Sequence, residues 1–401
     1  MLFLGKTYNG YGEIVGDGLE LDEDGSLLRV LTAEQTGHLS ESLEAVRGSY
    51  ITPGFVDIHC HGGGGFGFSD DYEPEQIQAA IKTHQRAGTT GMLASLVSLA
   101  NPVPQLEALS SFCASGELAG IHMEGPFLSK EKCGAQNPAV LRPVDTAELS
   151  SWLRISRGWI RTMTVAPEVE GAMEAAKLLF EHGAKPSWGH SNDSGQLTRG
   201  CLEGSSRLSA ECNGSRIAQT VTHLFNAMPQ INHRVPGPVR EYLQAARMGM
   251  VSVELIADGH HLSEDLVEDV LEYLYTMPAD EECLGALFVT DSLAAAGMEP
   301  GRYTLGGLSV EVRSGACYLA GTDTLAGGAS TLAEQFKLFA HRGRVKLPAL
   351  IRSCVCVPAI AGSIEDRPGV TLDFALGEKP NLLVFNEEHE ILKVVREGAQ
   401  L

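Results

Sequence analysis

Short apolar runs alternate with amphipathic segments through the middle of the chain. Eight runs have the composition of buried strands, at 55–58, 90–95, 118–122, 160–165, 186–189, 220–222, 250–256 and 286–290. Apolar residues recur at helical spacing over 74–87, 169–182, 263–275 and 331–341. Eight strands with crossover segments favour an α/β fold, a (β/α)8 TIM-like barrel. A doubly wound open sheet has the same alternation, and periodicity does not separate the two.

The two ends of the chain have a different pattern. Residues 1–50 contain short apolar stretches separated by Gly, Asp and Glu, and similar runs occur at 381–385 and 391–395. This pattern is typical of small antiparallel sheets with tight turns. We therefore expect a small β-sandwich domain built from residues 1–50 and 366–401, beside a barrel of residues 51–365.

The composition indicates which kinds of partner and which cellular location to expect. The 401 residues include 30 basic and 51 acidic ones, for a net charge of −21, which argues against nucleic acid or a membrane surface as a partner. No apolar run approaches the ~20 residues that span a bilayer. The N-terminus lacks a signal-peptide pattern, and the nine cysteines have no paired spacing. These features favour free thiols and a cytoplasmic location.

Histidines and acids follow several predicted strands at the point where each one ends. His59 and His61 are two residues apart, so both can face the same side of the first strand. The others are Glu124, His190, His223 and Asp291, after the third, fifth, sixth and eighth strands. Each alone has an ordinary structural interpretation, but in a barrel they converge on one pocket. Imidazoles and carboxylates without thiolates suit one or two divalent ions, zinc first, with iron, manganese and cobalt as alternatives.

A series of motifs runs through this region of the chain. They are Pro53–Gly62, Gly120–Phe127, Gly189–Asn192, Thr222–Pro229, Ile256–His261, Val289–Asp291 and Leu325–Gly327. In content and order they resemble the N-acetylglucosamine-6-phosphate deacetylases, of the metal-dependent amidohydrolase superfamily, from about residue 50 to 385. The segments 226–229 and 257–259 are more specific to that family than the metal ligands. The resemblance implies a (β/α)8 barrel with a small β domain.

The resemblance also implies roles for individual residues. Glu124, His190 and His223 would hold the principal metal, and His59 and His61 a second one. Asp291 would be the general base and acid, and would also touch the second metal. The substrate-binding set would be Ala135, Gln136, Asn226, Ala227, Arg234, Asp258, His261, Leu325, Ala326 and Gly327. In the homodimer that the family implies, Arg234 and His261 would bind phosphate and reach the neighbouring subunit's site.

The activity implied is hydrolysis of N-acetyl-D-glucosamine 6-phosphate to D-glucosamine 6-phosphate and acetate, a step of amino-sugar catabolism or recycling. Two alternatives stay open: the same reaction on N-acetylgalactosamine 6-phosphate, and a non-catalytic assembly protein on the amidohydrolase fold. The chain departs from the family at Gly134-Ala-Gln136-Asn-Pro138, where members often have His in place of Gln136. That change affects a position near the substrate. Cys133 precedes it, in a loop expected over the mouth.

Overall fold

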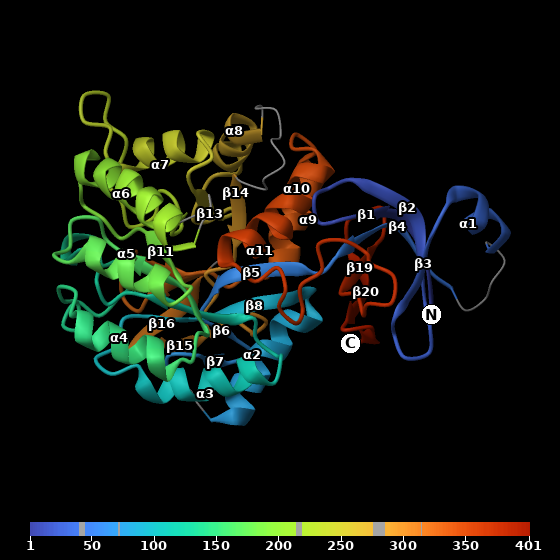
Figure 1. The fold of residues 1–401 in the computed structure, drawn as a ribbon, viewed down its shortest axis with the longest axis horizontal. Coiled ribbons are helices and arrows are strands. Elements are labelled where there is room, and N and C mark those ends of the chain that lie inside the picture. Colours follow the sequence, from blue (N-terminus) through green and yellow to red (C-terminus); the bar gives the residue numbers. More distant parts are fainter. Residues whose placement is uncertain (40–44, 71–72, 214–218, 276–284, 314) are drawn as a thin grey trace.

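The computed structural model describes residues 1–39, 45–70, 73–213, 219–275, 285–313 and 315–401. Its larger part is a parallel sheet of eight strands in the order β14-β13-β12-β11-β10-β9-β8-β5 (Figure 1). The strands are β5 (Phe55–Cys60), β8 (Thr89–Leu96), β9 (Gly120–Glu124), β10 (Ile160–Val165), β11 (Lys185–Trp188), β12 (Thr220–Val221), β13 (Ser252–Ile256) and β14 (Ala286–Val289). All eight predicted strands are confirmed.

The two edge strands of this sheet, β5 and β14, lie side by side and close it into a barrel. The backbone N–H of Asp291 donates to the carbonyl of His59 at 2.8 Å, and the N–H of His61 donates to the carbonyl of Ser292 at 2.8 Å. The Thr290 hydroxyl also donates to the buried Asp57 carboxylate at 2.6 Å. These contacts exclude the doubly wound open sheet, whose edge strands do not meet.

Helices surround the barrel strands (Figure 1). They are α2 (Pro74–Arg86), α3 (Val103–Ala114), α4 (Thr146–Ile155), α5 (Ala172–Glu181), α6 (Gln196–Asn213), α7 (Pro238–Arg247), α8 (Glu264–Tyr275), α9 (Leu332–Arg342), α10 (Leu347–Cys354) and α11 (Cys356–Gly362). In α2, the first turn contains Pro74, whose missing N–H costs nothing there. Ile77, Ala80 and Ile81 then bury one face against the sheet at the helical period. The four predicted helices are all confirmed.

Both chain ends build one seven-stranded sheet beside the barrel, in the order β21-β20-β19-β4-β1-β2-β3 (Figure 1). Its strands are β1 (Leu2–Tyr8), β2 (Ile14–Leu21), β3 (Leu27–Leu31), β4 (Ala45–Pro53), β19 (Leu382–Phe385), β20 (Ile391–Arg396) and β21 (Ala399–Gln400), with the short helix α1 (Ala33–Leu39). Phe3, Leu19, Ile51, Val384 and Val395 form its own core. The structure thus confirms a small β domain assembled from the two termini.

Two β elements were not expected. The glycine run after β5 forms a tight hairpin of β6 (Gly62–Gly63) and β7 (Phe66–Gly67). Its turn residues Gly64 and Gly65 have φ of 61° and 92°, which side chains disfavour. An antiparallel sheet is inserted between β14 and α9. Its strands are β15 (Arg302–Leu305), β16 (Leu308–Arg313), β17 (Ala316–Leu319) and β18 (Leu325–Gly327). This insert carries residues 325–327 to the barrel mouth.

The helices and cysteines can be compared with the expectations drawn from composition. Across the described ranges, no helix combines the length and apolar character that a bilayer crossing requires. Of the eight cysteines in the described ranges, seven are free thiols, namely Cys60, Cys113, Cys133, Cys201, Cys212, Cys317 and Cys354, and Cys356 is disulfide-bonded, which departs from the expectation of free thiols.

Candidate metal centre and active site

A cavity of about 210 Å³ opens at the carboxyl end of the barrel strands. Five of the six predicted metal ligands line it: His61, Glu124, His190, His223 and Asp291. His59, fully buried, lies directly behind them. The structure therefore brings together groups from β5, β9 and the segments after β11, β12 and β14, as expected of a barrel.

Glu124, His190 and His223 form the first triad. Oε1 of Glu124 lies 2.9 Å from Nε2 of His190 and 3.0 Å from Nε2 of His223, and the two nitrogens are 3.1 Å apart. Ligands about 2.0–2.1 Å from a tetrahedral zinc ion are separated by roughly 3.3 Å. The spacing and the donor types of this triad fit a divalent cation.

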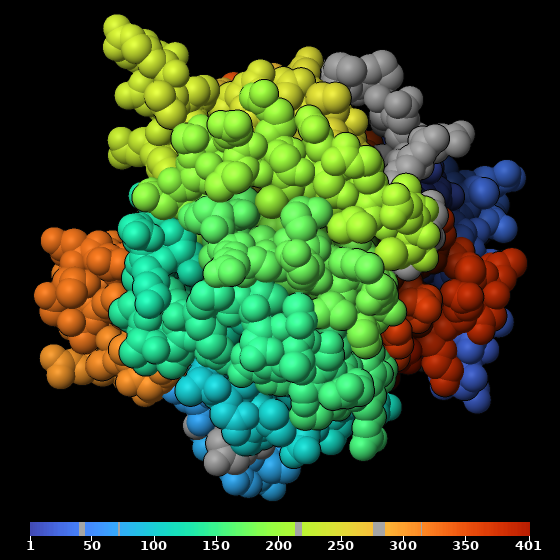
Figure 2. Space-filling view, turned by 60° about the vertical axis from the view of Figure 1, so that its left-hand side comes forward, coloured from blue at the N-terminus to red at the C-terminus, as the bar shows by residue number. Residues whose placement is uncertain are grey.

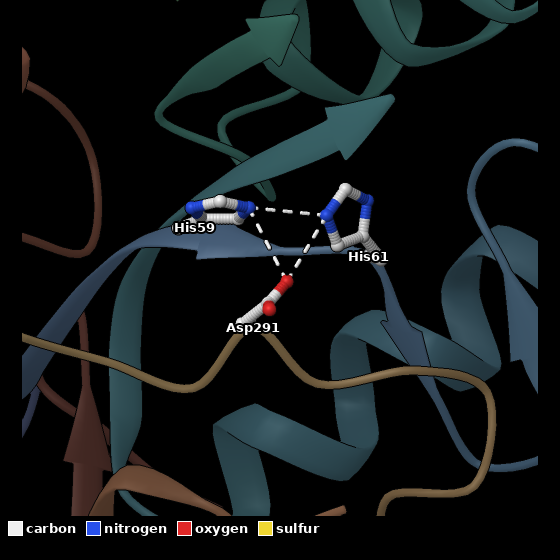
Figure 3. A group of neighbouring side chains, drawn as sticks. All are labelled: His59, His61 and Asp291. Carbon is white, nitrogen blue, oxygen red and sulfur yellow. Dashed lines mark hydrogen bonds and ion pairs between the residues drawn. The ribbon is translucent and has the colours of Figure 1, made fainter. Parts of the chain in front are cut away.

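His59, His61 and Asp291 form the second triad (Figure 3). The two Nε2 atoms are 3.1 Å apart, and Oδ1 of Asp291 lies 3.3 Å from the first and 3.2 Å from the second. Barrel closure between β5 and β14 produces this triad, since it joins segments more than 200 residues apart. Glu124 lies between the two triads, because its Oε2 is 3.3 Å from Nε2 of His61. A carboxylate in that place can bridge two cations.

The far side of three imidazoles is held by acceptors. Nδ1 of His59 lies 2.9 Å from Oε2 of Glu254, Nδ1 of His61 3.2 Å from the Ser95 carbonyl, and Nδ1 of His190 2.8 Å from the Lys132 carbonyl. A ring that donates through Nδ1–H presents a lone pair at Nε2, which is the form a metal ligand needs. Facing lone pairs at 3.1 Å repel one another, and a cation between them removes that repulsion.

Glu254 is a site residue that the sequence analysis missed. It is 1% exposed on β13, and its Oε2 also accepts the backbone N–H of His223 at 3.1 Å. One carboxylate oxygen thus orients a histidine from each triad. The available signal was an acid inside the apolar strand of residues 250–256. Such an acid is buried only when it has partners.

Electrostatics in the cavity favour positive charge among the carboxylates. Burial lowers the pKa of His59, but the carboxylates of Asp291, Glu254 and Glu124 outweigh it and raise that pKa to about 10. Burial likewise opposes the raised pKa of His61, which Asp291 and Glu124 bring to about 9. For Glu124, burial raises the pKa, but the neighbouring histidines, His190 first, hold it well below its usual value. A divalent cation supplies the charge that this environment favours.

The backbone is strained at three of the ligands. His190, His223 and Asp291 have φ of 48°, 26° and 46°. Non-glycine residues in the left-handed region cost on the order of 1–3 kcal/mol each, and they cluster at functional sites. All three follow directly after barrel strands, so the strain turns each side chain into the mouth.

Most of the predicted substrate-binding residues line the same cavity. They are Ala135, Gln136, Asn226, Ala227, His261, Leu325, Ala326 and Gly327. His261 lines the cavity of its own chain, beside the other predicted substrate-binding residues. Asp258 is not in the lining. Instead its Oδ2 lies 2.8 Å from Nδ1 of His261, and its Oδ1 accepts the backbone N–H of His261 at 2.9 Å.

Arg234 lies apart from the cavity of its own chain. It belongs to the segment between β12 and α7, in which residues 230–235 are all exposed. This segment projects from the barrel as the yellow-green extension of Figure 2. Ile231 and Val235 on it are 53% and 56% exposed.

His122 lies within the barrel strand β9, two residues before Glu124, but belongs to neither triad. Its two ring nitrogens lie 2.9 Å from the hydroxyls of Ser95 and Thr164. Burial first, and then the charge of His59, lower its pKa well below the ordinary value. It is a neutral structural imidazole behind the site.

A closed eight-stranded barrel whose mouth gathers imidazoles and carboxylates into a candidate metal centre defines an amidohydrolase, and a model of the amidohydrolase family matches residues 50–194. The N-acetylglucosamine-6-phosphate deacetylase of Bacillus subtilis (strain 168) is 32% identical over 326 residues, 79% of this chain and 76% of the relative. The chain belongs to the N-acetylglucosamine-6-phosphate deacetylase family.

Two further relatives bear on the substrate. A solved structure of a mutant N-acetyl-D-glucosamine-6-phosphate deacetylase from Mycobacterium smegmatis, in complex with N-acetyl-D-glucosamine-6-phosphate, has a TM-score of 0.85 at 30% identity. That match covers 100% of this chain and 98% of the other. The N-acetylgalactosamine-6-phosphate deacetylase of Escherichia coli O157:H7 is 31% identical over 271 residues, 66% of each chain.

Proposed function

We propose that the protein hydrolyses the N-acetyl group of N-acetyl-D-glucosamine 6-phosphate, giving D-glucosamine 6-phosphate and acetate in amino-sugar catabolism or recycling. The observation that carries this function is the meeting of the Glu124, His190 and His223 triad with Asp291 in one cavity, in a member of this family. Acetate release from the sugar phosphate by the purified, metal-loaded protein tests it.

The first triad would hold the principal cation, and His59, His61 and Asp291 a second one. Zinc suits the imidazole and carboxylate donors and the ligand separations, and iron, manganese and cobalt accept the same donors. When bound, such a cation polarises the acetyl carbonyl and lowers the pKa of a water toward about 7.

Asp291 is the proposed general base and acid. It is the acid of the second triad and lines the cavity, so its carboxylate is placed to take a proton from the attacking water. It then returns this proton to the amine nitrogen, because an unprotonated amide nitrogen is a poor leaving group. Neither step needs a serine or cysteine nucleophile.

The phosphate would be bound at the other end of the cavity. A protein of charge −21 attracts a dianion only through local cations. His261, oriented by Asp258, is one candidate inside the cavity. Asn226 and Ala227 would add contacts to the sugar phosphate.

We further propose a homodimer in which Arg234 enters the neighbouring subunit's cavity and pairs with the phosphate. The projecting segment supports this proposal for two reasons. The guanidinium of Arg234 does not line the cavity of its own chain, and the exposed side chains of Ile231 and Val235 offer apolar contacts to a partner. Arginine binds phosphate oxygens through paired hydrogen bonds. The oligomeric state in solution is a direct check.

The galactosamine isomer is the second candidate substrate, because one relative carries that name at 31% identity. Acetate release measured on both sugar phosphates and on their unphosphorylated forms separates the candidates. Equal rates with and without phosphate would contradict the roles of Arg234 and His261. A non-catalytic assembly protein is disfavoured because both triads are complete. Purified protein without bound metal or turnover would support that alternative.

We also propose a cytoplasmic location and a division into a β domain of residues 1–50 and 366–401 and a barrel of residues 51–365. Seven free thiols in the described ranges support the location, although Cys356 is disulfide-bonded. The pairing of β4 with β19 joins the two chain ends in one sheet and supports a β domain of this kind, although β4 carries that sheet on to Pro53.

A further inference from the structure

The carboxylate of Glu124 has a partner outside both triads. Nε2 of Gln136 donates a hydrogen bond to Oε2 of Glu124, and Oε1 of Gln136 accepts the backbone N–H of Ser98 at 2.7 Å. A backbone N–H only donates and a carboxylate only accepts, so the side-chain amide has one possible orientation. Both of its ends are therefore engaged in a defined sense.

Gln136 is held firmly in this place. It is 5% exposed, and its backbone N–H donates to the Cys133 carbonyl at 3.0 Å. The Ser98 hydroxyl, in turn, donates to the backbone carbonyl of Glu124 at 3.1 Å. The ends of β8 and β9 and the loop that follows β9 are thereby tied together around one carboxylate.

The two oxygens of Glu124 consequently have different surroundings. Oε1 faces His190 and His223 at 2.9 and 3.0 Å and His59 at 3.6 Å, and within the described part of the chain no amide donates to it. Oε2 faces His61 at 3.3 Å while it also accepts from Gln136. The neutral donor on Oε2 fixes the orientation of the carboxylate plane. Oε1, which accepts no amide hydrogen bond, then points toward His190 and His223 of the first triad.

We propose that Gln136 is a positioning residue for Glu124, which gives the Glu124, His190 and His223 site its high cation affinity. This goes beyond the substrate contact expected at this position, and it rests on the proposed metal site. The amide retains a second N–H, which remains available to a molecule in the cavity.

The test is the affinity for zinc of Gln136→Met, a variant of similar length that lacks the donor. Apo-protein is titrated with zinc against a chelating indicator, and bound metal is counted by elemental analysis. Loss of a hydrogen-bonded partner behind a metal ligand costs about 10–100-fold in affinity. We expect the dissociation constant of the first zinc ion to rise by that factor. If the Gln136→Met variant does not fold, Gln136→Leu, which also lacks the donor, takes its place in the titration.

Gln335→Met is the matched control. Gln335 is 1% exposed, and both ends of its amide are also engaged, donating to the Val289 carbonyl at 3.1 Å and the Ser330 hydroxyl at 3.2 Å and accepting from the Ala257 N–H at 3.3 Å. This control loses the same kind of buried hydrogen bonds without touching a triad. Its zinc affinity should equal that of the unmodified protein.

Gln136→His, measured at pH 8, is the rescue variant, because neutral imidazole keeps one acceptor and one donor. Recovered zinc affinity supports the proposal. Affinity as weak as in Gln136→Met contradicts it, and so does an unchanged affinity in Gln136→Met or an equal loss in Gln335→Met. Failure of the unmodified protein to bind zinc, iron, manganese or cobalt overturns the metal site itself, and with it the proposed function.

Discussion

Glu254 offers the sharpest test of how the site is held. Its Oε2 accepts from Nδ1 of His59 at 2.9 Å and from the backbone N–H of His223 at 3.1 Å, so Glu254→Gln keeps the shape but removes the charge from both bonds. Hydrogen bonds to a charged group contribute about 1.5–3 kcal/mol and neutral ones about 0.5–1.5 kcal/mol. The two bonds together lose roughly 2–3 kcal/mol, which is about a 30–150-fold weaker zinc affinity.

The assay is chelator competition for zinc, followed by acetate release at saturating metal. We expect the lower affinity together with a fall in kcat, because misaligned imidazoles hold the cation less well. Glu268→Gln is the matched control. Glu268 on α8 is also 1% exposed, but its carboxylate accepts hydrogen bonds from Arg342 on α9 at 2.8 and 3.0 Å and does not line the cavity. Unchanged zinc affinity and kcat in folded Glu254→Gln would refute the reasoning that this carboxylate orients both triads.

Three other predictions concern the acid, the projecting arginine and a buried lysine. Asp291→Asn should still bind a cation at the first triad but lose several orders of magnitude in kcat, and rates near normal would remove the proton-transfer role. Arg234→Ala should raise KM for the phosphorylated substrate. A mixed dimer of one Arg234→Ala subunit and one Asp291→Asn subunit should recover activity, because one of its two sites has both Asp291 and the partner's unmodified arginine. No recovery would contradict the shared site. Burial lowers the pKa of Lys185 to about 8, so the unfolded chain holds more protons between pH 8 and about 10.5. Unfolding free energy should therefore rise over that range by up to about 3 kcal/mol relative to Lys185→Met, as denaturant titrations would measure.

Local patterns of residues determined much of this protein. Apolar runs located all eight barrel strands, and helical spacing located α2, α5, α8 and α9. The spacing of His59 and His61 predicted that both imidazoles face one side, and strand ends predicted where the other ligands lie. These properties depend on neighbours in the sequence, so they can be read without the fold.

Tertiary structure alone decided which distant residues meet. Periodicity could not show that β14 closes on β5, and that closure is what places Asp291 3.2 Å from His61. The orientation of His59 by Glu254 likewise joins two strands, and the contact of Gln136 with Glu124 and the inward position of His261 depend on how loops fold back at the barrel mouth. Such contacts follow from how whole elements pack, because each depends on the path of the chain between the partners and not on the residues beside them.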